Sequence, residues 1–234
     1  MGQRISYYKN NFQKTLKEIL FENFPAFREW YLNFEKSSLE EFNEPFGNEM
    51  LIDYFKLNPD FKTDFPKLDK KIIDELTSEF IGVYCDFTDR GGKILQFFGP
   101  TFNKWRYDQS TEMIEQSGDA LFIRLWNFII KGRSLTDNDV FESFTNDRKV
   151  GFLTFDEHRV LKDKIESYFG SIEIMKDKYW TEKEKSEERE AIANSKDGAY
   201  SLSQHNPKSF GLEIVLQVLN EISTYKNELI TFID

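Results

Sequence analysis

The segment from Gly118 to Gly170 constrains the fold more than any other part of the chain. It contains two apolar runs at helical spacing, separated by an acidic connector and a short Val150–Leu153 step. In the first run, Leu121 and Leu125 begin an apolar face, and the large side chains that follow widen it well beyond one stripe. A helix with so wide an apolar surface is predicted to be buried on most sides.

The second run begins with a helix-capping signal. The Thr154 hydroxyl can accept a hydrogen bond from a free backbone N–H of the first turn, and Glu157 can accept one from the backbone of Thr154. Apolar residues then continue at helical spacing, and Gly170 follows where a left-handed C-terminal cap is expected. The pattern predicts a helix over residues 155–169.

Helical periodicity also dominates the rest of the chain. The segment from Tyr7 to Ser37 predicts two helices or one bent helix, because Pro25 interrupts an aromatic-rich apolar pattern. From 69 to 87 a helix is preferred, although a strand over 80–87 is an alternative because Ile81 and Val83 are β-branched. Further helices are predicted over 50–57, over 107–117, after a Thr136 N-cap and from Ser209 to Ile230.

Together these patterns predict a mainly α fold, as a single compact helical domain over residues 1–234, with α+β as the alternative. A minor β element is expected near Ile94–Phe98 or Val150–Leu153. Residues 176–197 contain six basic and seven acidic side chains. This segment is therefore predicted to form a charged helical insertion or lid.

Composition indicates a folded protein, because 24 Phe, 10 Tyr and 4 Trp supply large core side chains. The single cysteine, Cys85, excludes an intramolecular disulfide and a cysteine-based zinc site. Neither a secretory signal nor an apolar run long enough to cross a membrane is found in the sequence. These features predict a cytoplasmic protein without membrane association.

The formal charge of −10 is concentrated in three stretches: 35–60, 108–119 and 134–147. A dense Lys/Arg face is missing, so binding to a nucleic-acid backbone is disfavoured. An acidic surface can instead attract a basic protein, although solubility alone also explains it. The predicted partner-binding residues are nine of the acids in these stretches, namely Glu40, Glu41, Glu44, Asp108, Glu112, Glu115, Asp137, Asp139 and Glu142.

No residue pattern specifies a chemical reaction. His158 lies on the predicted polar side of its helix, and neither it nor His205 has a metal-ligand partner one turn away. Asp86, Asp89 and Asp119 adjoin apolar runs and are candidates for perturbed pKa values, but a role as helix ends and surface acids is much the better explanation of them. We therefore predict no catalytic residues, no metal and no cofactor.

One further pattern resembles a known family. The chain has an apolar helix that ends in a Gly-containing turn, then an acidic connector, and then Val-Gly-Phe-Leu-Thr-Phe-Asp-Glu before a second apolar helix. This arrangement resembles the YfbM-like family of uncharacterised bacterial proteins. The opening Met1-Gly2 followed by Tyr7-Tyr8 is also similar, whereas Cys85-Asp86-Phe87-Thr88 departs from that family's pattern. The resemblance implies a compact cytoplasmic, mainly helical or α+β domain and no established catalytic residues.

The leading functional hypothesis is a non-enzymatic protein that binds another protein. Its most concrete form is a bacterial immunity protein whose acidic surface covers a basic toxin and blocks it sterically. The rival hypothesis is a hydrolase or small-molecule-binding protein with an aromatic-lined pocket. A purely structural, oligomeric helical protein is a third possibility.

Overall fold

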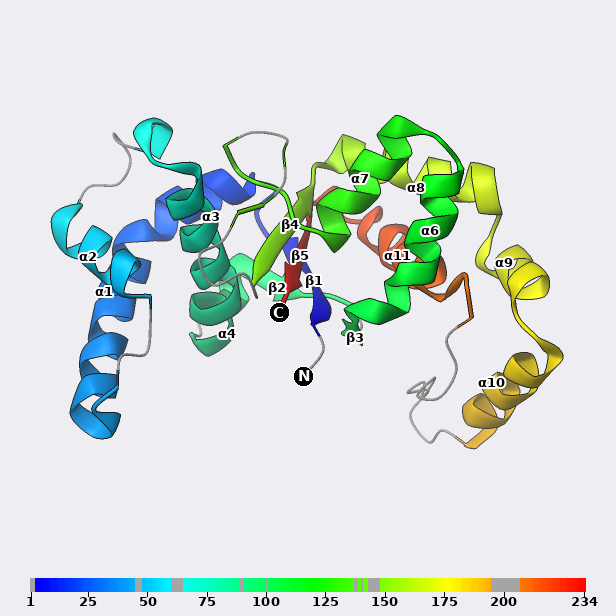
Figure 1. Cartoon of the computed structure of the whole chain (residues 1–234), viewed down its shortest axis with the longest axis horizontal. Helices are drawn as coiled ribbons and strands as arrows, with labels where there is room; N and C mark the ends of the chain where they lie inside the picture. Colours follow the sequence, from blue (N-terminus) through cyan, green and yellow to red (C-terminus); the bar gives the residue numbers. More distant parts are fainter. Residues whose placement is uncertain are drawn as a thin grey trace.

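The computed structural model describes residues 3–44, 48–59, 65–88, 91–99, 101–136, 139, 141–142, 148–194 and 207–234. In this part of the chain, an antiparallel five-stranded sheet lies between two layers of helices (Figure 1). The strands are β1 (Arg4–Asn10), β2 (Leu95–Phe97), β3 (Phe102–Asn103), β4 (Lys149–Leu153) and β5 (Leu229–Ile233). The helices are α1 (Leu16–Phe42), α2 (Glu49–Leu57), η1 (Phe65–Lys67), α3 (Lys70–Glu79), η2 (Phe80–Tyr84), α4 (Cys85–Phe87), α5 (Gly91–Ile94), η3 (Lys104–Tyr107), α6 (Asp108–Gln116), α7 (Ala120–Ile130), α8 (Phe155–Phe169), α9 (Ile172–Tyr179), α10 (Glu182–Asn194) and α11 (Phe210–Ile222).

The two ends of the chain form the middle of the sheet. The strand order is β2-β1-β5-β4, and β3 pairs with β1 beside β2. Along β5, Leu229 and Ile233 point to one face, while Ile230 and Phe232 point to the other, as the two-residue period of a strand requires. Every residue of β5 is buried, because helices cover both faces.

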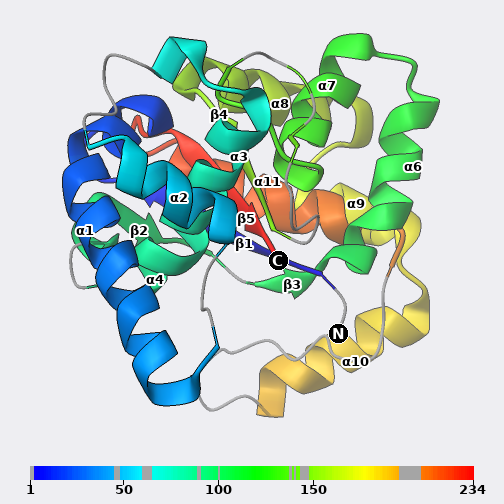
Figure 2. The same cartoon turned by 60° about the vertical axis from the view of Figure 1, so that its left-hand side comes forward.

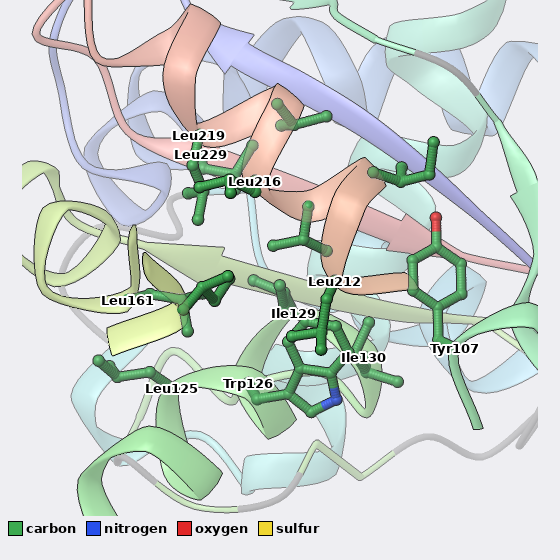
Figure 3. Close-up of a cluster of buried hydrophobic side chains, with 14 of the residues drawn as sticks. Tyr107, Leu125, Trp126, Ile129, Ile130, Leu161, Leu212, Leu216, Leu219 and Leu229 are labelled. Carbon is green, nitrogen blue, oxygen red and sulfur yellow. The ribbon is translucent and has the colours of Figure 1, made fainter. Parts of the chain in front are cut away.

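Helices α6, α7, α8, α9 and α11 cover the first face, which we call the aliphatic face. Its core is made mainly of leucine, isoleucine and valine side chains from α7, α8, α11 and β5, with Trp126 and Tyr107 at one side (Figure 3). The α7 backbone approaches the sheet closely at Gly151, where an added Cβ would lie 2.0 Å from the carbonyl oxygen of Phe128.

Helices α1, α2 and α3 and the π-helical turn η2 cover the second face, which we call the aromatic face (Figure 2). Phe27 is central to it, because its ring lies 5.4–5.9 Å from those of Tyr31, Phe55, Phe80 and Tyr84. Such edge-to-face and tilted pairs add to the energy of apolar burial. Gly82 belongs to the same packing, since the ring of Phe232 occupies the place where a side chain would start.

The predicted fold class is confirmed, since the protein is mainly helical with a small antiparallel sheet. Helix α8 has the predicted bounds, and both hydrogen bonds of the Thr154–Glu157 capping box are present. Both candidate β segments form strands, β2 and β4. The helices predicted over 50–57 and 107–117 correspond to α2 and α6, and the helix preferred over 69–87 corresponds to α3, η2 and α4.

Two helix predictions were wrong at the ends of the chain. Tyr7 begins no helix but lies within β1, and Leu229 and Ile230 lie within β5 rather than at the end of α11. All of β5 and, from Tyr7 onward, β1 are buried on both faces, so these stretches lack the polar alternation that distinguishes a strand from a helix.

Smaller features also differ from expectation. Gly170 has a φ of 84° with ψ −166°, outside the left-handed helical region expected for it. α1 continues through Pro25, so of the two predicted alternatives the chain forms one helix rather than two. The charged segment 176–197 is divided between α9 and α10 by the buried Trp180, whose indole donates to Glu213. Residues 195–197 and most of the segment after Thr136 lie outside the described residues.

Candidate partner-binding surface

The C-terminal end of α1 projects from the body of the molecule and is the most exposed helical segment on the aromatic face (Figure 1). After Glu35, which is buried, every residue to Glu44 is exposed except the half-buried Ser38. Leu39 and Phe42 are 47% and 65% exposed although both are large and apolar. These two residues define, with the acids around them, the surface that we call the α1 tip (residues 36–44).

Helical spacing brings the apolar side chains of the α1 tip into line with the packed part of the helix. Leu32 packs partly against the aromatic core, and Leu39 and Phe42 follow it at intervals of seven and ten residues, about two and three turns. The helix ends in order, because the backbone N–H of Asn43, a residue at φ 53°, donates to Leu39 O. The tip is therefore a regular helix, and no described residue packs closely enough over its apolar side chains to bury them.

The charges of the α1 tip are mainly negative. Glu40, Glu41 and Glu44 are all exposed, and Lys36 lies 3.8 Å from Glu40 with both side chains more than two-thirds exposed. Lys36 offsets one of these three carboxylates, so the α1 tip keeps a net charge of −2. The α1 tip thus combines an apolar stripe with an acidic border.

The other predicted partner-binding acids lie elsewhere. Asp108, Glu112 and Glu115 are exposed on α6, which covers the aliphatic face at the opposite end of the molecule from the α1 tip (Figure 1). Glu115 also lies 3.9 Å from Lys131. The structure therefore does not bring these acids together with those of α1 into one surface.

The acids of the connector before β4 form a third group. Asp139 and Glu142 are exposed, and Asp137 lies outside the described residues. The Glu142 carboxylate lies 3.9 Å from Lys70, while its backbone N–H donates to Asp74 at 2.9 Å. Glu142 therefore helps to hold the connector against α3 as well as contributing charge.

Beneath this connector, α3 carries a buried polar face that sequence reasoning did not identify. Asp74, Glu75, Ser78 and Glu79 share one side of the helix, and all are at most 5% exposed. Ser134 donates to Asp74 at 2.8 Å, Asn48 donates to Glu75 at 3.3 Å, and Arg148 lies 3.7 Å from Glu79. These donors join α3 to the start of α2 and to both ends of the connector.

Burial raises the pKa of Glu79 to about 7, an effect that Arg148 opposes and Glu75 reinforces. A carboxyl group that titrates near neutral pH can serve as a general acid or base. Glu79 is only 5% exposed, however, and the contacts around it are those of a clamp between helices. We therefore assign the polar face of α3 a structural role.

His158 and Cys85 both have structural surroundings. His158 was expected on the polar side of its helix, but it is fully buried, and its Nε2 lies 3.0 Å from the carbonyl oxygen of Asn227. Burial lowers the pKa of His158 and raises that of Cys85. Cys85 packs into the aromatic face, whereas α8, which carries His158, covers the other face, so the sheet separates the two.

The candidate aspartates are explained in the same way. Asp119 is the N-cap of α7 and also pairs with Lys164, whose hydrogen bond lowers the pKa of Asp119. Asp86 accepts from the hydroxyl of Tyr8 at 3.0 Å, and burial raises its pKa. Asp89 lies outside the described residues.

Within the described ranges, no three His, Cys, Asp or Glu side chains are grouped to hold a metal ion. The helices of the same part of the chain include none with the length and apolar character needed to cross a membrane. Comparisons of this chain with protein-family models, with curated proteins and with solved structures found no match. Function must therefore be inferred from the surfaces themselves.

Sequence reasoning identified the acids of the α1 tip but not Leu39 and Phe42 beside them. The signal was present, because Leu39 and Phe42 follow Leu32 at seven and ten residues, about two and three helical turns. Spacing alone predicts that they would be buried with the rest of that pattern. Only the tertiary structure reveals that α1 extends beyond the core that covers its earlier turns.

Proposed function

We propose that this chain is a non-enzymatic binding protein that uses the α1 tip to hold a basic protein partner. The observation that carries the proposal is the exposure of Leu39 and Phe42 on a regular helix whose last two turns project beyond the fold. Large apolar side chains that meet a pocket on a partner contribute most of the energy of many interfaces. A helix that lays such residues into a groove is a common mode of protein recognition.

The charge of the α1 tip supports a basic partner. Glu40, Glu41 and Glu44 border the apolar stripe, and the whole chain carries a formal charge of −10. Opposite charge on the partner would speed encounter and fix the orientation of docking, while contributing less to the lifetime of the complex than the apolar contacts do. The partner surface should therefore be an apolar groove with lysine or arginine at its rim.

A specific form of this function is neutralisation of a toxin by covering its active surface, which an acidic surface facing a basic toxin favours. The test is co-expression of this chain with the product of the adjacent reading frame, followed by size-exclusion chromatography and a growth assay of that neighbour alone. A stable complex with a neighbour that is toxic alone supports an immunity role. Separate elution and normal growth would overturn it.

Within such a complex, the two contributions of the α1 tip can be separated by mutation. Reversing Glu40, Glu41 and Glu44 to lysine should mainly lower the association rate and weaken its dependence on salt. Reversing Asp108, Glu112 and Glu115 on α6 supplies a control with the same change of charge. Equal loss of association rate in both triple variants would show that overall charge, and not the α1 tip, steers the partner.

A further inference from the structure

A second feature of the aromatic face is a hollow of about 380 Å³ beside the turn between β1 and α1. Its walls come from the turn, from the first two turns of α1 and from α5. The volume falls within the range of small-molecule sites in proteins. The residues that line the hollow are Phe12, Ile19, Glu22, Asn23, Lys93 and Ile94.

The base of the hollow is apolar and its rim carries an aromatic ring. Ile19 and Ile94 are 2% and 6% exposed and belong to the core of the aromatic face. Phe12 is 59% exposed, so a flat apolar group that entered the hollow would cover part of its ring. Removal of these surfaces from water is favourable for any apolar ligand body.

The hollow is held in shape without a ligand. The Asn10 side chain accepts from the backbone N–H of Phe12 at 2.7 Å and donates to the carbonyl oxygen of Lys14. Asn11 ties the same turn to α5, since its side chain donates to the carbonyl oxygen of Lys93 at 3.2 Å. A preformed site loses less conformational freedom when it binds.

The backbone of the turn also departs from ordinary geometry. Gln13 has a φ of 53°, a left-handed conformation that few non-glycine residues adopt. The strained turn directs the chain into α1 directly after the exposed Phe12. Strain of this kind persists where the surrounding contacts require a particular shape.

The charges at the hollow favour an anion. Glu22 forms an ion pair with Lys14, so the charges of these two side chains sum to zero. Lys93, in contrast, is exposed and takes part in none of the ion pairs found between described residues. The surplus charge beside the apolar base is thus one ammonium group.

From this combination we infer that the hollow beside Phe12 is a binding site for a small aromatic anion. The aromatic body lies on Ile19 and Ile94 and against the ring of Phe12, and its carboxylate or sulfonate pairs with Lys93. This site is separate from the α1 tip, which lies about three turns or more further along α1 from Asn23. Its occupation therefore does not depend on the proposed protein partner.

Two fluorescent probes with the same aromatic body test the inference. 8-Anilinonaphthalene-1-sulfonate carries an anionic group, whereas N-phenyl-1-naphthylamine is neutral. Titration of the full chain with each should give saturable binding at one site, with the sulfonate bound more tightly. Lys93→Gln should weaken the sulfonate by about fivefold, the equivalent of an exposed ion pair, and leave the neutral probe unchanged. Phe12→Ala should weaken both probes.

Three exposed residues provide matched controls. Lys178→Gln removes a lysine from α9, while Leu57→Ala and Phe42→Ala remove exposed apolar side chains from α2 and from the α1 tip. None of these changes should alter either affinity. The inference is overturned if the sulfonate does not bind, if Phe12→Ala and Lys93→Gln leave its affinity unchanged, or if Phe42→Ala weakens it as much as Phe12→Ala does.

Discussion

The two faces of the sheet are built from different materials and carry different surfaces. The aliphatic face packs branched side chains of α7, α8 and α11 closely on the strands (Figure 3). The aromatic face packs rings around Phe27 and encloses a layer of carboxylates on α3. Both candidate binding features, the α1 tip and the hollow beside Phe12, lie on the aromatic side.

This difference suggests that the two faces of the sheet have different roles. Branched aliphatic side chains pack densely, so the aliphatic face is suited to act as a scaffold. On the aromatic face, α1 has 27 residues, against 15 in α8, and it extends past the core, which leaves apolar side chains such as Phe42 in solvent. The predictions below test whether the two faces respond differently to equivalent changes.

The largest effect is expected from glycines at which the helical layers meet the sheet. Gly151→Ala would place a Cβ 2.0 Å from a backbone oxygen of α7, which cannot move alone, and should destabilise the fold on the order of 5 kcal/mol. Gly82→Ala on the aromatic face meets the ring of Phe232 and should cost roughly 2 to 3 kcal/mol. Urea unfolding measures both, and Gly92→Ala, with nothing within 4 Å of the new Cβ, is the control. Equal losses of unfolding free energy at Gly151 and Gly82 would contradict the expected difference between the two faces of the sheet.

The aromatic cluster should depend strongly on its central ring. Phe27→Ala removes contacts with four other rings and leaves a cavity, so we expect a loss of roughly 3 to 5 kcal/mol in unfolding free energy. Phe97→Ala, which removes a ring that is 56% exposed, should cost far less. Similar losses in the two variants would mean that the aromatic face lacks a defined centre.

The buried carboxylates should make stability depend on pH. Because the pKa of Glu79 rises from 4.5 to about 7 on folding, the folded state keeps a proton that the unfolded state loses, and stability falls as pH rises through this window. Glu79→Gln should therefore be more stable than the wild type by up to about 3 kcal/mol at pH 8 but not at pH 4. Thermal unfolding across this range measures the difference. A difference that is constant with pH would refute the assignment.

The smallest effect concerns the helix caps on the two faces. Thr154 and Glu157 form a reciprocal capping box on α8, whereas Thr15 on α1 accepts one hydrogen bond of 3.3 Å. Thr154→Ala should destabilise the protein by about 1 kcal/mol and Thr15→Ala by about half as much. Chemical denaturation resolves the two values, and a larger cost at Thr15 would reverse the expected order.

Much of the helical part could be predicted from the sequence, because local signals coincide with the final contacts. The capping box fixes the start of α8, and Asp119 lies at the N-cap of α7 directly before its wide apolar face. The strands at the chain ends could not be recognised, because burial on both sides removes the alternation that marks a strand, from Tyr7 onward in β1 and throughout β5. The pairing of Tyr7 with Thr231 also joins residues from opposite ends of the sequence.

The candidate site was predicted only in part, for a related reason. Charge is visible in a sequence, so Glu40, Glu41 and Glu44 could be named in advance. Exposure of Leu39 and Phe42 depends on where the core ends, which periodicity does not report. The hollow likewise combines Phe12 with Lys93, which are 81 positions apart and meet only through the pairing of the β1 turn with α5.

The measurement that tests the central proposal most directly is calorimetric titration of the neighbouring-gene product with two matched double variants. Leu39→Ala with Phe42→Ala removes the apolar stripe of the α1 tip, and Leu121→Ala with Ile174→Ala removes two comparably exposed side chains from the aliphatic face. We predict that the first pair weakens binding by about 30-fold or more and the second by less than about twofold. Retained affinity in the α1 variant, or a greater loss in the aliphatic-face variant, would contradict the account.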